Sequence, residues 1–162
     1  MNATEVFEAI RAFGEHEHRD LARGLDHIHA AACAIAVGSR VDDLRAIREV
    51  LRWSEVLLEP HMTWEDDWLY PQIDRMSGTP WATRAARFDH GQIHHLASRL
   101  RRDVELVGDG LTPSVVDDVR SHLFAYEALL RTHIEREERL LLPVLVEEAA
   151  GAGLLAGGRS PT

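Results

Sequence analysis

Two short segments of the chain share one pattern of residues that can bind metal ions. Residues 61–71 read HMTWEDDWLYP and residues 133–143 read HIEREERLLLP, so each has a histidine, a glutamate four positions later and then a proline. Residues four apart in an α-helix lie on one face, one turn along. Each segment would therefore present an imidazole and a carboxylate together. Imidazole binds iron, copper, nickel and zinc, and a bridging carboxylate favours two hard or borderline cations.

The pattern recurs because the chain repeats itself at a fixed offset. His61 and His133 are 72 residues apart, and so are Glu65 and Glu137. The same offset separates further pairs: His18 and His90, Pro71 and Pro143, Leu51 and Leu123, Leu58 and Leu130, Leu69 and Leu141. Two copies of one helical hairpin, related by an approximate twofold axis, would produce this repeat. Matching residues would face one another around the axis, where a site for two metal ions would lie.

The chain reads as four long helices joined by short connections. Hydrophobic residues recur at helical spacing, and no segment sustains the period of two that is typical of a strand. The expected helices span residues 4 (or, after a break at Gly14, 15) to 38, 43 to 71, 80 to 107 and 113 to 149. This pattern favours an all-α fold, an antiparallel up-down-up-down four-helix bundle built from two similar helical hairpins. Residues 1–150 would form the bundle, and residues 151–162 a flexible, glycine-rich tail.

Proline and threonine mark the expected helix ends. The Thr-Pro pairs at 79–80 and 112–113 each supply an N-cap followed by a proline at the first helical position. Pro71 is expected to end the second helix. Pro60 lies inside that helix, directly before His61, and predicts a kink next to the metal-binding pattern. A kink there could be merely tolerated or could control access of a ligand, and the sequence leaves both open.

Three further histidines enlarge the candidate metal site. His90 and His94 are four residues apart, and His18 adds one imidazole from the first helix. The candidate ligands are five imidazoles and two carboxylates from four helices: His18, His61, Glu65, His90, His94, His133 and Glu137. Seven ligands are too many for one tetrahedral zinc ion and suit two six-coordinate irons that share an oxygen bridge. Leucines flank these residues on the inward stripe, and buried polar groups of this kind need partners such as metal ions.

Residues beside the ligand pairs have simpler interpretations. Asp66 lies off the face of His61 on a helical wheel and is expected to be solvated. Trp68, seven residues after His61, shares that face and is expected to pack in the core. Tyr126, seven residues before His133, either packs in the core or lines the ligand pocket.

The chain resembles hemerythrin-like (HHE) proteins over roughly residues 12–148. The motifs that carry the resemblance are EH-x2-L-x3-L at 17–25, H-x3-E-x5-P at 61–71 and 133–143, and DH-x2-I at 89–93. The resemblance implies that His90, His94 and His133 hold one iron, and that His18 and His61 hold the other. It also implies that Glu65 and Glu137 bridge the irons together with an oxo or hydroxo group.

Two details qualify what the resemblance implies. Oxygen-carrying hemerythrins usually bridge with an aspartate five residues after the fourth-helix histidine, whereas this chain has Glu137 and Glu138 four and five residues after His133. Glu137 is the expected bridge because it mirrors Glu65, and the altered bridge argues against reversible oxygen carriage. Ala22 stands opposite His94 in the repeat. The iron of the half that lacks this histidine, the one held by His18 and His61, should then keep an open position for a small ligand.

The leading hypothesis is a non-haem di-iron protein that binds or reacts with oxygen, nitric oxide or hydrogen peroxide. Gas binding or sensing, and defence against peroxide or nitric oxide, both fit, so enzymatic activity such as peroxide decomposition stays open. One alternative is a ferritin-like di-iron oxidase, but that architecture uses two Glu-x-x-His motifs, and the only match is Glu15 to His18. Another is a haem-binding bundle with two axial histidines, which would leave both matched glutamates without a purpose.

Composition excludes several other classes of protein. A net charge of −9 argues against nucleic acid and against an anionic membrane surface as partners. No run of about 18 apolar residues suggests a membrane span, and the N-terminal residues lack the layout of a signal peptide. The single cysteine, Cys33, cannot form an internal disulfide, which fits a reducing compartment. The sequence therefore predicts a cytoplasmic, monomeric protein whose partners are small molecules.

Overall fold

Four long helical segments make up the protein in a computed structural model that describes residues 3–35, 41–106 and 112–145. Two of the segments are α-helical throughout, and the other two contain short π-helices, labelled η. In chain order they are α1 (Ala3–Ala34); α2 (Val41–Trp53), η1 (Ser54–Leu58), α3 (Glu59–Trp64), η2 (Glu65–Leu69) and α4 (Tyr70–Met76); α5 (Arg84–Leu106); and α6 (Pro113–Arg136) followed by η3 (Glu137–Leu141).

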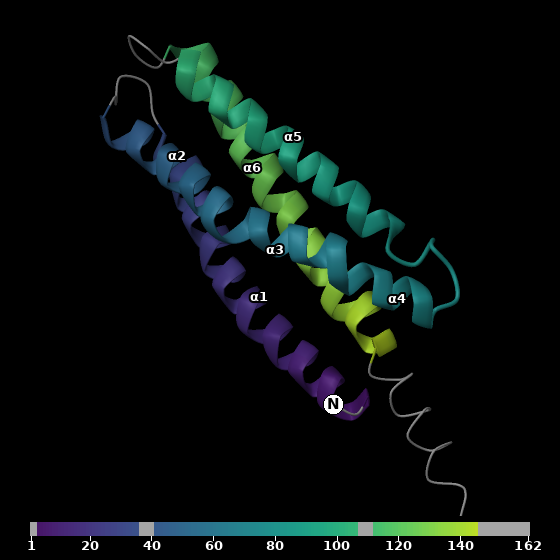
Figure 1. Ribbon diagram of the computed structural model, residues 1–162. Helices are drawn as coiled ribbons and strands as arrows, with labels where there is room; N and C mark the ends of the chain where they lie inside the picture. The colour runs from purple at the N-terminus through teal and green to yellow at the C-terminus, as the bar shows by residue number, and fades with distance from the viewer. Residues whose placement is uncertain (1–2, 36–40, 107–111, 146–162) are drawn as a thin grey trace, which may run out of the picture.

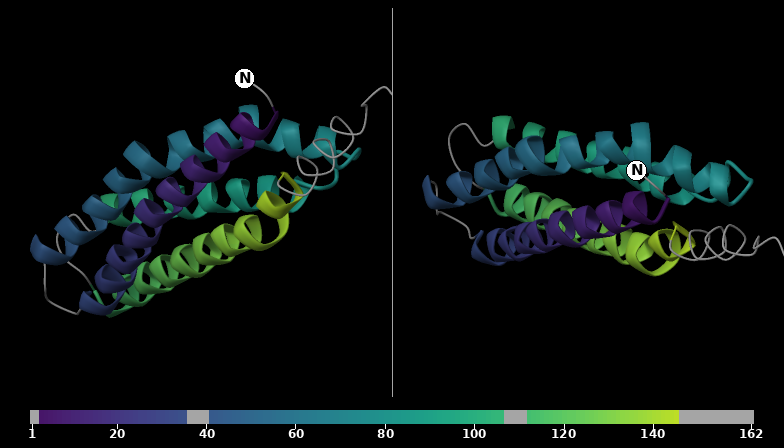
Figure 2. Two further views of the ribbon diagram at one scale, coloured as in Figure 1. Left: turned by 90° about the horizontal axis from the view of Figure 1, so that it is seen from below. Right: turned by 60° about the horizontal axis from the view of Figure 1, so that its bottom comes forward.

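The four segments run alternately up and down along one axis (Figure 1). Helix α1 packs against α2 and α6, and α5 packs against α2 and α6, so each segment has two neighbours around the bundle. The two views of Figure 2 show the same elongated arrangement from other sides. The described residues contain no strand. The predicted antiparallel four-helix bundle of two hairpins is confirmed.

Some predicted helix ends are confirmed and others are wrong. Helix α6 begins as expected, because Thr112 Oγ1 accepts a hydrogen bond from the backbone N–H of Val115 at 3.4 Å. Helix α1 continues through Gly14 without the break considered above. The second segment does not end at Pro71 but continues to Met76. The expected ends at residues 38, 107 and 149, and the tail from residue 151, lie outside the described residues.

The π-helices explain how the helices pass through proline. Pro60, Pro71 and Pro143 each lie two residues beyond the last residue of a π-helix. Proline has no N–H to donate and crowds the carbonyl of the preceding turn, and the wider π turn gives it room. At Pro71, the nearby carbonyl of Asp66 accepts instead from Arg87 Nη1 at 3.1 Å. The second segment changes direction between α2 and α3, where the sequence predicted a kink at Pro60 (Figure 1).

The third helix begins later than the Thr-Pro pair at 79–80 predicts. Helix α5 starts at Arg84, after a turn. Asp74 fixes this turn, since its Oδ1 accepts hydrogen bonds from the backbone N–H of Thr83 at 3.2 Å and from Thr83 Oγ1 at 3.0 Å. Thr83 is fully buried. A contact between two segments therefore sets the start of the helix, and local capping does not.

The hydrophobic core consists of two clusters, one on each side of a layer of buried polar residues. The larger cluster fills the part of the bundle where α1, α2, α5 and α6 meet, and includes Leu25, Ile28, Ile47, Leu100 and Leu123. The smaller cluster contains Ile10, Leu69, Tyr70, Ile73, Ala86, Leu141 and Leu145. Along the segments, the following buried residues lie between positions of the larger and the smaller cluster: His18, His61, Glu65, His90, His133 and Glu137. The core thus encloses the polar layer and separates it from water.

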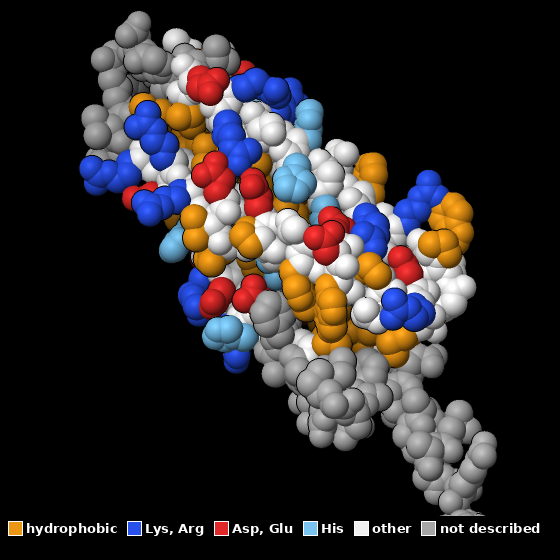
Figure 3. All heavy atoms as spheres, in the orientation of Figure 1, with side chains coloured by type: hydrophobic (Ala, Val, Ile, Leu, Met, Phe, Trp, Pro, Cys, Tyr) orange, Lys and Arg blue, Asp and Glu red, His pale blue; other side chains and the backbone are white. Residues whose placement is uncertain are grey.

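On the face of the molecule in Figure 3, acidic and basic side chains are interspersed. Within the described ranges, no helix is long and apolar enough to cross a membrane.

Close packing of α1 against α2 leads to a first prediction about stability. A Cβ atom at Gly24 would overlap the ring of Trp53. We expect Gly24→Ala to destabilise the protein by about 1–3 kcal/mol, as overpacked cores do. Gly91→Ala is the matched control, because nothing lies within 4 Å of a Cβ there. That change should stabilise the helix by up to about 1 kcal/mol. Chemical denaturation of both variants measures the change in their free energies of unfolding. Equal changes would contradict the close packing of Gly24 against Trp53.

Candidate metal centre

Six polar side chains converge in the buried layer between the two hydrophobic clusters. Each is at most 6% exposed: His18, His61, Glu65, His90, His133 and Glu137. They form two groups of possible ligands, and in each group the ligand atoms lie within 4.8 Å of one another. One group contains His18 and His61, the other contains His90 and His133, and both contain the two glutamates. The matched halves of the sequence therefore meet as the repeat predicted.

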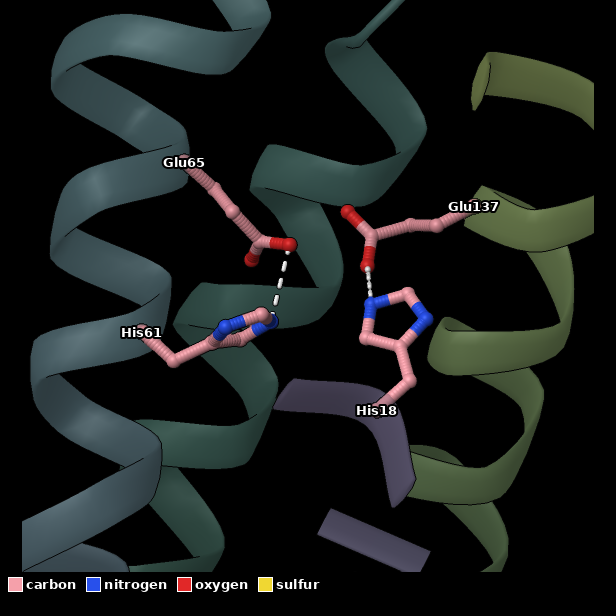
Figure 4. A group of neighbouring side chains, drawn as sticks. All are labelled: His18, His61, Glu65 and Glu137. Atoms are coloured by element: carbon pink, nitrogen blue, oxygen red, sulfur yellow. Dashed lines mark ion pairs between the residues drawn. The ribbon is translucent and has the colours of Figure 1, made fainter. Parts of the chain in front are cut away.

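Glu65 connects the two histidine pairs. Its Oε1 lies 2.9 Å from His61 Nε2, while its Oε2 lies 3.2 Å from His90 Nε2 and 3.9 Å from His133 Nε2. Glu137 does the same from the opposite side, with Oε2 at 3.5 Å from His18 Nε2 and 3.6 Å from His133 Nε2. Figure 4 shows the two carboxylates pointing toward the space between the helices from η2 and η3. Each carboxylate therefore lies between the two histidine pairs.

Several buried atoms of these histidines and glutamates have no hydrogen-bond partner, and this indicates whether the residues fit metal ions. Glu65 Oε2, Glu137 Oε2 and His61 Nε2 are buried and make no hydrogen bond. Leaving such atoms without a partner costs free energy, especially on a carboxylate. A cation in each group would be bound by these lone pairs, and mixed imidazole and carboxylate donors suit first-row transition metals. The residues therefore fit a pair of metal ions.

A second layer of carboxylates contacts the outer nitrogens of the four histidines. Each Nδ1 faces one acid: His18 faces Glu138 at 3.2 Å, His61 faces Glu17 at 3.4 Å, His90 faces Asp66 at 3.0 Å and His133 faces Asp89 at 3.7 Å. These acids also follow the repeat, because Glu17 pairs with Asp89 and Asp66 pairs with Glu138 at the offset of 72. A carboxylate at Nδ1 holds the proton there and leaves Nε2 free to bind a metal.

Two of the outer acids, Asp66 and Glu138, have roles that differ from those considered in the sequence analysis. Asp66 was expected to be solvated, but it contacts His90 and is only half-exposed. Glu138 was the alternative to Glu137 as the bridge. The Glu137 side chain is 1% exposed and belongs to both ligand groups, whereas the Glu138 side chain is 53% exposed and contacts the outer nitrogen of His18.

Two of the three described π-helices begin at the shared glutamates. Helix η2 starts at Glu65 and η3 at Glu137, and π-bulges in α-helices are frequent at functional sites. Since a π-helix closes its hydrogen bonds between residues five apart, it brings Tyr70 to the same face as Glu65. Trp68 is turned outward instead: it is 37% exposed and stacks on Trp64, so the prediction that it packs in the core is wrong.

Tyr70 is a residue of the site that sequence reasoning missed. Its side chain is fully buried, and its hydroxyl donates to Glu137 Oε1 and lies 3.2 Å from His90 Nε2. Burial and the nearby carboxylates of Glu137 and Glu65 raise the pKa of the phenol, so it stays protonated. The signal that could have revealed Tyr70 is its five-residue spacing from Glu65 together with Pro71, which together indicate a π turn.

Tyr126 lies away from the two ligand groups. It is fully buried within the larger hydrophobic cluster, and its hydroxyl hydrogen-bonds with Ser54 Oγ at 2.7 Å. Of the two interpretations considered for it, this position supports packing.

His94 is the one predicted ligand that the structure does not bring to the site. Its side chain is exposed, and it belongs to neither ligand group. At 100° per residue, the buried residues Ala86, Ile93 and Ala97 fall to one side of His90 around α5, and His94 falls to the other. The structure gives no support to His94 as a ligand. The opposite residue, Ala22, is exposed as well.

The family model described as Hemerythrin HHE cation binding domain matches residues 10–154. The chain belongs to this family. The match covers nearly the whole chain, so the resemblance seen in the motifs is confirmed, and cation binding is the property that the family description names. No curated protein and no solved structure matched the chain.

Charges within this hemerythrin HHE domain balance one another when no metal is bound. Burial lowers the pKa of His18, but Glu137, Glu65 and Glu138 outweigh it, and the net pKa is raised. His90 follows the same pattern, with Glu65 and Asp66 raising its pKa against burial. Burial would raise the pKa of Glu65, yet the close imidazoles of His133, His61 and His90 hold it well below its usual value. In the metal-free domain the raised pKa values of His18 and His90 thus favour their charged forms beside the buried carboxylates.

The metal-free domain should therefore lose stability as pH rises. A histidine with a raised pKa in the folded state contributes stability below its unfolded pKa of about 6.5, and this contribution disappears as pH rises through the folded pKa. For His18 and His90 the loss begins above pH 6.5. The lowered pKa of Glu65 acts at the other end, where its contribution disappears as pH falls well below 4.5.

Denaturation of chelated protein across neutral and mildly alkaline pH measures this loss. His18→Gln should flatten the dependence, because it removes one of the two histidines whose pKa is raised. His94→Gln is the matched control and should leave the dependence unchanged, since that side chain is exposed. A metal-free wild type whose stability is constant above pH 6.5 would contradict the proposed charge balance.

Proposed function

We propose that the protein holds two iron ions in its buried ligand groups and binds or reacts with small oxidants, namely oxygen, nitric oxide or hydrogen peroxide. One observation carries the proposal: each of two buried glutamates contacts histidines of both pairs. Such shared carboxylates suit two cations held close together, and the family is one of cation-binding domains.

Each residue has a role in this proposal. His18 and His61 hold one ion, His90 and His133 hold the other, and the two glutamates, Glu65 and Glu137, bridge them. When bound, the iron pair with its oxo or hydroxo bridge supplies a change of oxidation state and a position for a small ligand. The outer carboxylates orient the imidazoles, and the two hydrophobic clusters keep water from the site. His94 is left out because its side chain is exposed.

The composition of the site favours this function over its alternatives. A ferritin-like di-iron oxidase uses more carboxylates than histidines, whereas the two groups here contain four histidines and two glutamates. A haem would need the space between two axial histidines. Glu65 contacts both His61 and His90, and Glu137 contacts both His18 and His133, so carboxylates lie between the histidine pairs.

Metal analysis combined with an optical spectrum tests the proposal. Protein produced with adequate iron should contain about two irons per chain and show the near-ultraviolet bands of a bridged ferric pair, without the Soret band of haem. The spectrum should change when azide, nitric oxide or peroxide is added. A protein that contains one zinc and no iron would refute the di-iron function.

A further inference from the structure

At the offset of 72, each proposed ligand of the centre has a residue of the same type in the other half of the chain. Tyr70, which contacts these ligands, has no such match. The shared glutamates match, the two histidine pairs match, and the four outer acids match at the offset of 72. The residue at this offset from Tyr70 is Leu142, which has no polar group to offer. Tyr70 therefore breaks the approximate twofold symmetry of the site.

The hydroxyl of Tyr70 lies beside one histidine pair. It donates to Glu137 Oε1 and lies 3.2 Å from His90 Nε2. The same His90 nitrogen lies 3.2 Å from His133 Nε2, so the hydroxyl and the second imidazole both lie close to this nitrogen. A metal ion binds an imidazole nitrogen at about 2 Å. An oxygen 3.2 Å from that nitrogen then lies in the space where another ligand of the same ion would bind.

Several contacts hold Tyr70 in this position. Its ring stacks on His90, with 5.4 Å between the ring centroids and 26° between the planes. The guanidinium of Arg87 lies 5.1 Å from the centroid of the Tyr70 ring. Asp66 accepts hydrogen bonds from Arg87 Nη1 at 3.1 Å, through both its carbonyl and its carboxylate, and the same carboxylate contacts His90. The phenol is thus fixed by the residues that orient His90.

We propose that Tyr70 makes the two metal positions unequal. Its hydroxyl fills the remaining ligand space of the ion held by His90 and His133, and a small ligand consequently binds the ion held by His18 and His61. The hydrogen bond to Glu137 Oε1 also leaves Oε2 as the oxygen that faces the metals. This inference rests on the proposed function. It replaces the contrast between His94 and Ala22 as the origin of the asymmetry, because both of those side chains are exposed.

Tyr70→Phe tests the inference because it removes only the hydroxyl. Iron-loaded wild type should show two distinct iron environments in its Mössbauer spectrum and bind one azide per chain in a calorimetric titration. Tyr70→Phe should keep two irons, bring the two environments closer together and bind up to two azides per chain. Tyr70→Leu, which copies Leu142, should give the same results. Tyr126→Phe is the matched control, since its hydroxyl contacts Ser54 away from the site, and it should behave as wild type.

The outcomes separate this inference from the proposed function. If both Tyr70 variants keep two irons, two distinct environments and one azide per chain, the role of Tyr70 is refuted while the di-iron function stands. If Tyr70→Phe loses one iron, the hydroxyl is needed to hold the ion, and its role as a filler of ligand space is refuted. If wild type itself does not hold two irons, both proposals are refuted.

Discussion

Glu65→Gln protein is expected to lose high-affinity binding of both metal ions. Glu65 contacts three of the four histidines, from both pairs, at 2.9 to 3.9 Å. The amide keeps the shape of the side chain but removes its negative charge and replaces one ligand oxygen with an NH2 donor. Changes to residues that only orient a ligand cost about 10–100-fold in metal affinity. Replacing a ligand that both ions share should therefore cost more than about 100-fold for each ion.

Titration of metal-free protein with ferrous iron measures this effect. Glu138→Gln is the matched control, because it makes the same chemical change at an acid that contacts only the outer nitrogen of His18 among the proposed ligands. We expect Glu138→Gln to keep two ions with affinity lowered by about 10–100-fold. A Glu65→Gln protein that loses one ion and keeps the other at wild-type affinity would show that Glu65 does not bridge.

The pairs His61 with Glu65 and His133 with Glu137 could be predicted from the sequence because their geometry is local. Four residues of α-helix place both side chains on one face, whatever the rest of the fold does. The offset of 72 then indicates that the two pairs meet, since equivalent positions of two packed hairpins face a common axis. The bundle followed from the same repeat and from the helical spacing of the leucines.

The π-helices are the reason that several neighbours of these pairs were misplaced. A helical wheel assumes 100° per residue along the whole helix, and η2 breaks that assumption at Glu65. Beyond this point, Asp66 and Tyr70 turn toward the site and Trp68 turns toward solvent. Pro71 was read as the end of a helix, although it follows a π turn inside one.

Other differences depend on contacts between segments, which no local pattern records. His94 has the spacing of a ligand relative to His90, but the packing of α5 on its neighbours turns that position toward solvent. Likewise, the Thr-Pro pair at 79–80 is a good local start for a helix. The hydrogen bonds between Asp74 and Thr83 delay that start to Arg84.

Removal of the metal is expected to lower the unfolding temperature substantially. Without cations, two carboxylates and four imidazoles remain buried between the hydrophobic clusters, and some of their atoms lack hydrogen bonds. A ligand present at 1,000 times its dissociation constant stabilises the folded state by about 4 kcal/mol. In a domain of this size, 1 kcal/mol corresponds to roughly 2–4 °C. Iron loading should therefore raise the unfolding temperature by about 8–16 °C.

Thermal unfolding of loaded and chelated protein, followed by circular dichroism, measures this shift. The shift should widen as pH rises above 6.5, because the stability that the raised pKa values of His18 and His90 give the metal-free state is then lost. Glu65→Gln supplies the comparison, since a protein that cannot bridge two ions should gain little from added iron. If wild type unfolds at one temperature with and without metal, ion binding does not stabilise the fold. The buried histidines and glutamates would then need another partner in the core.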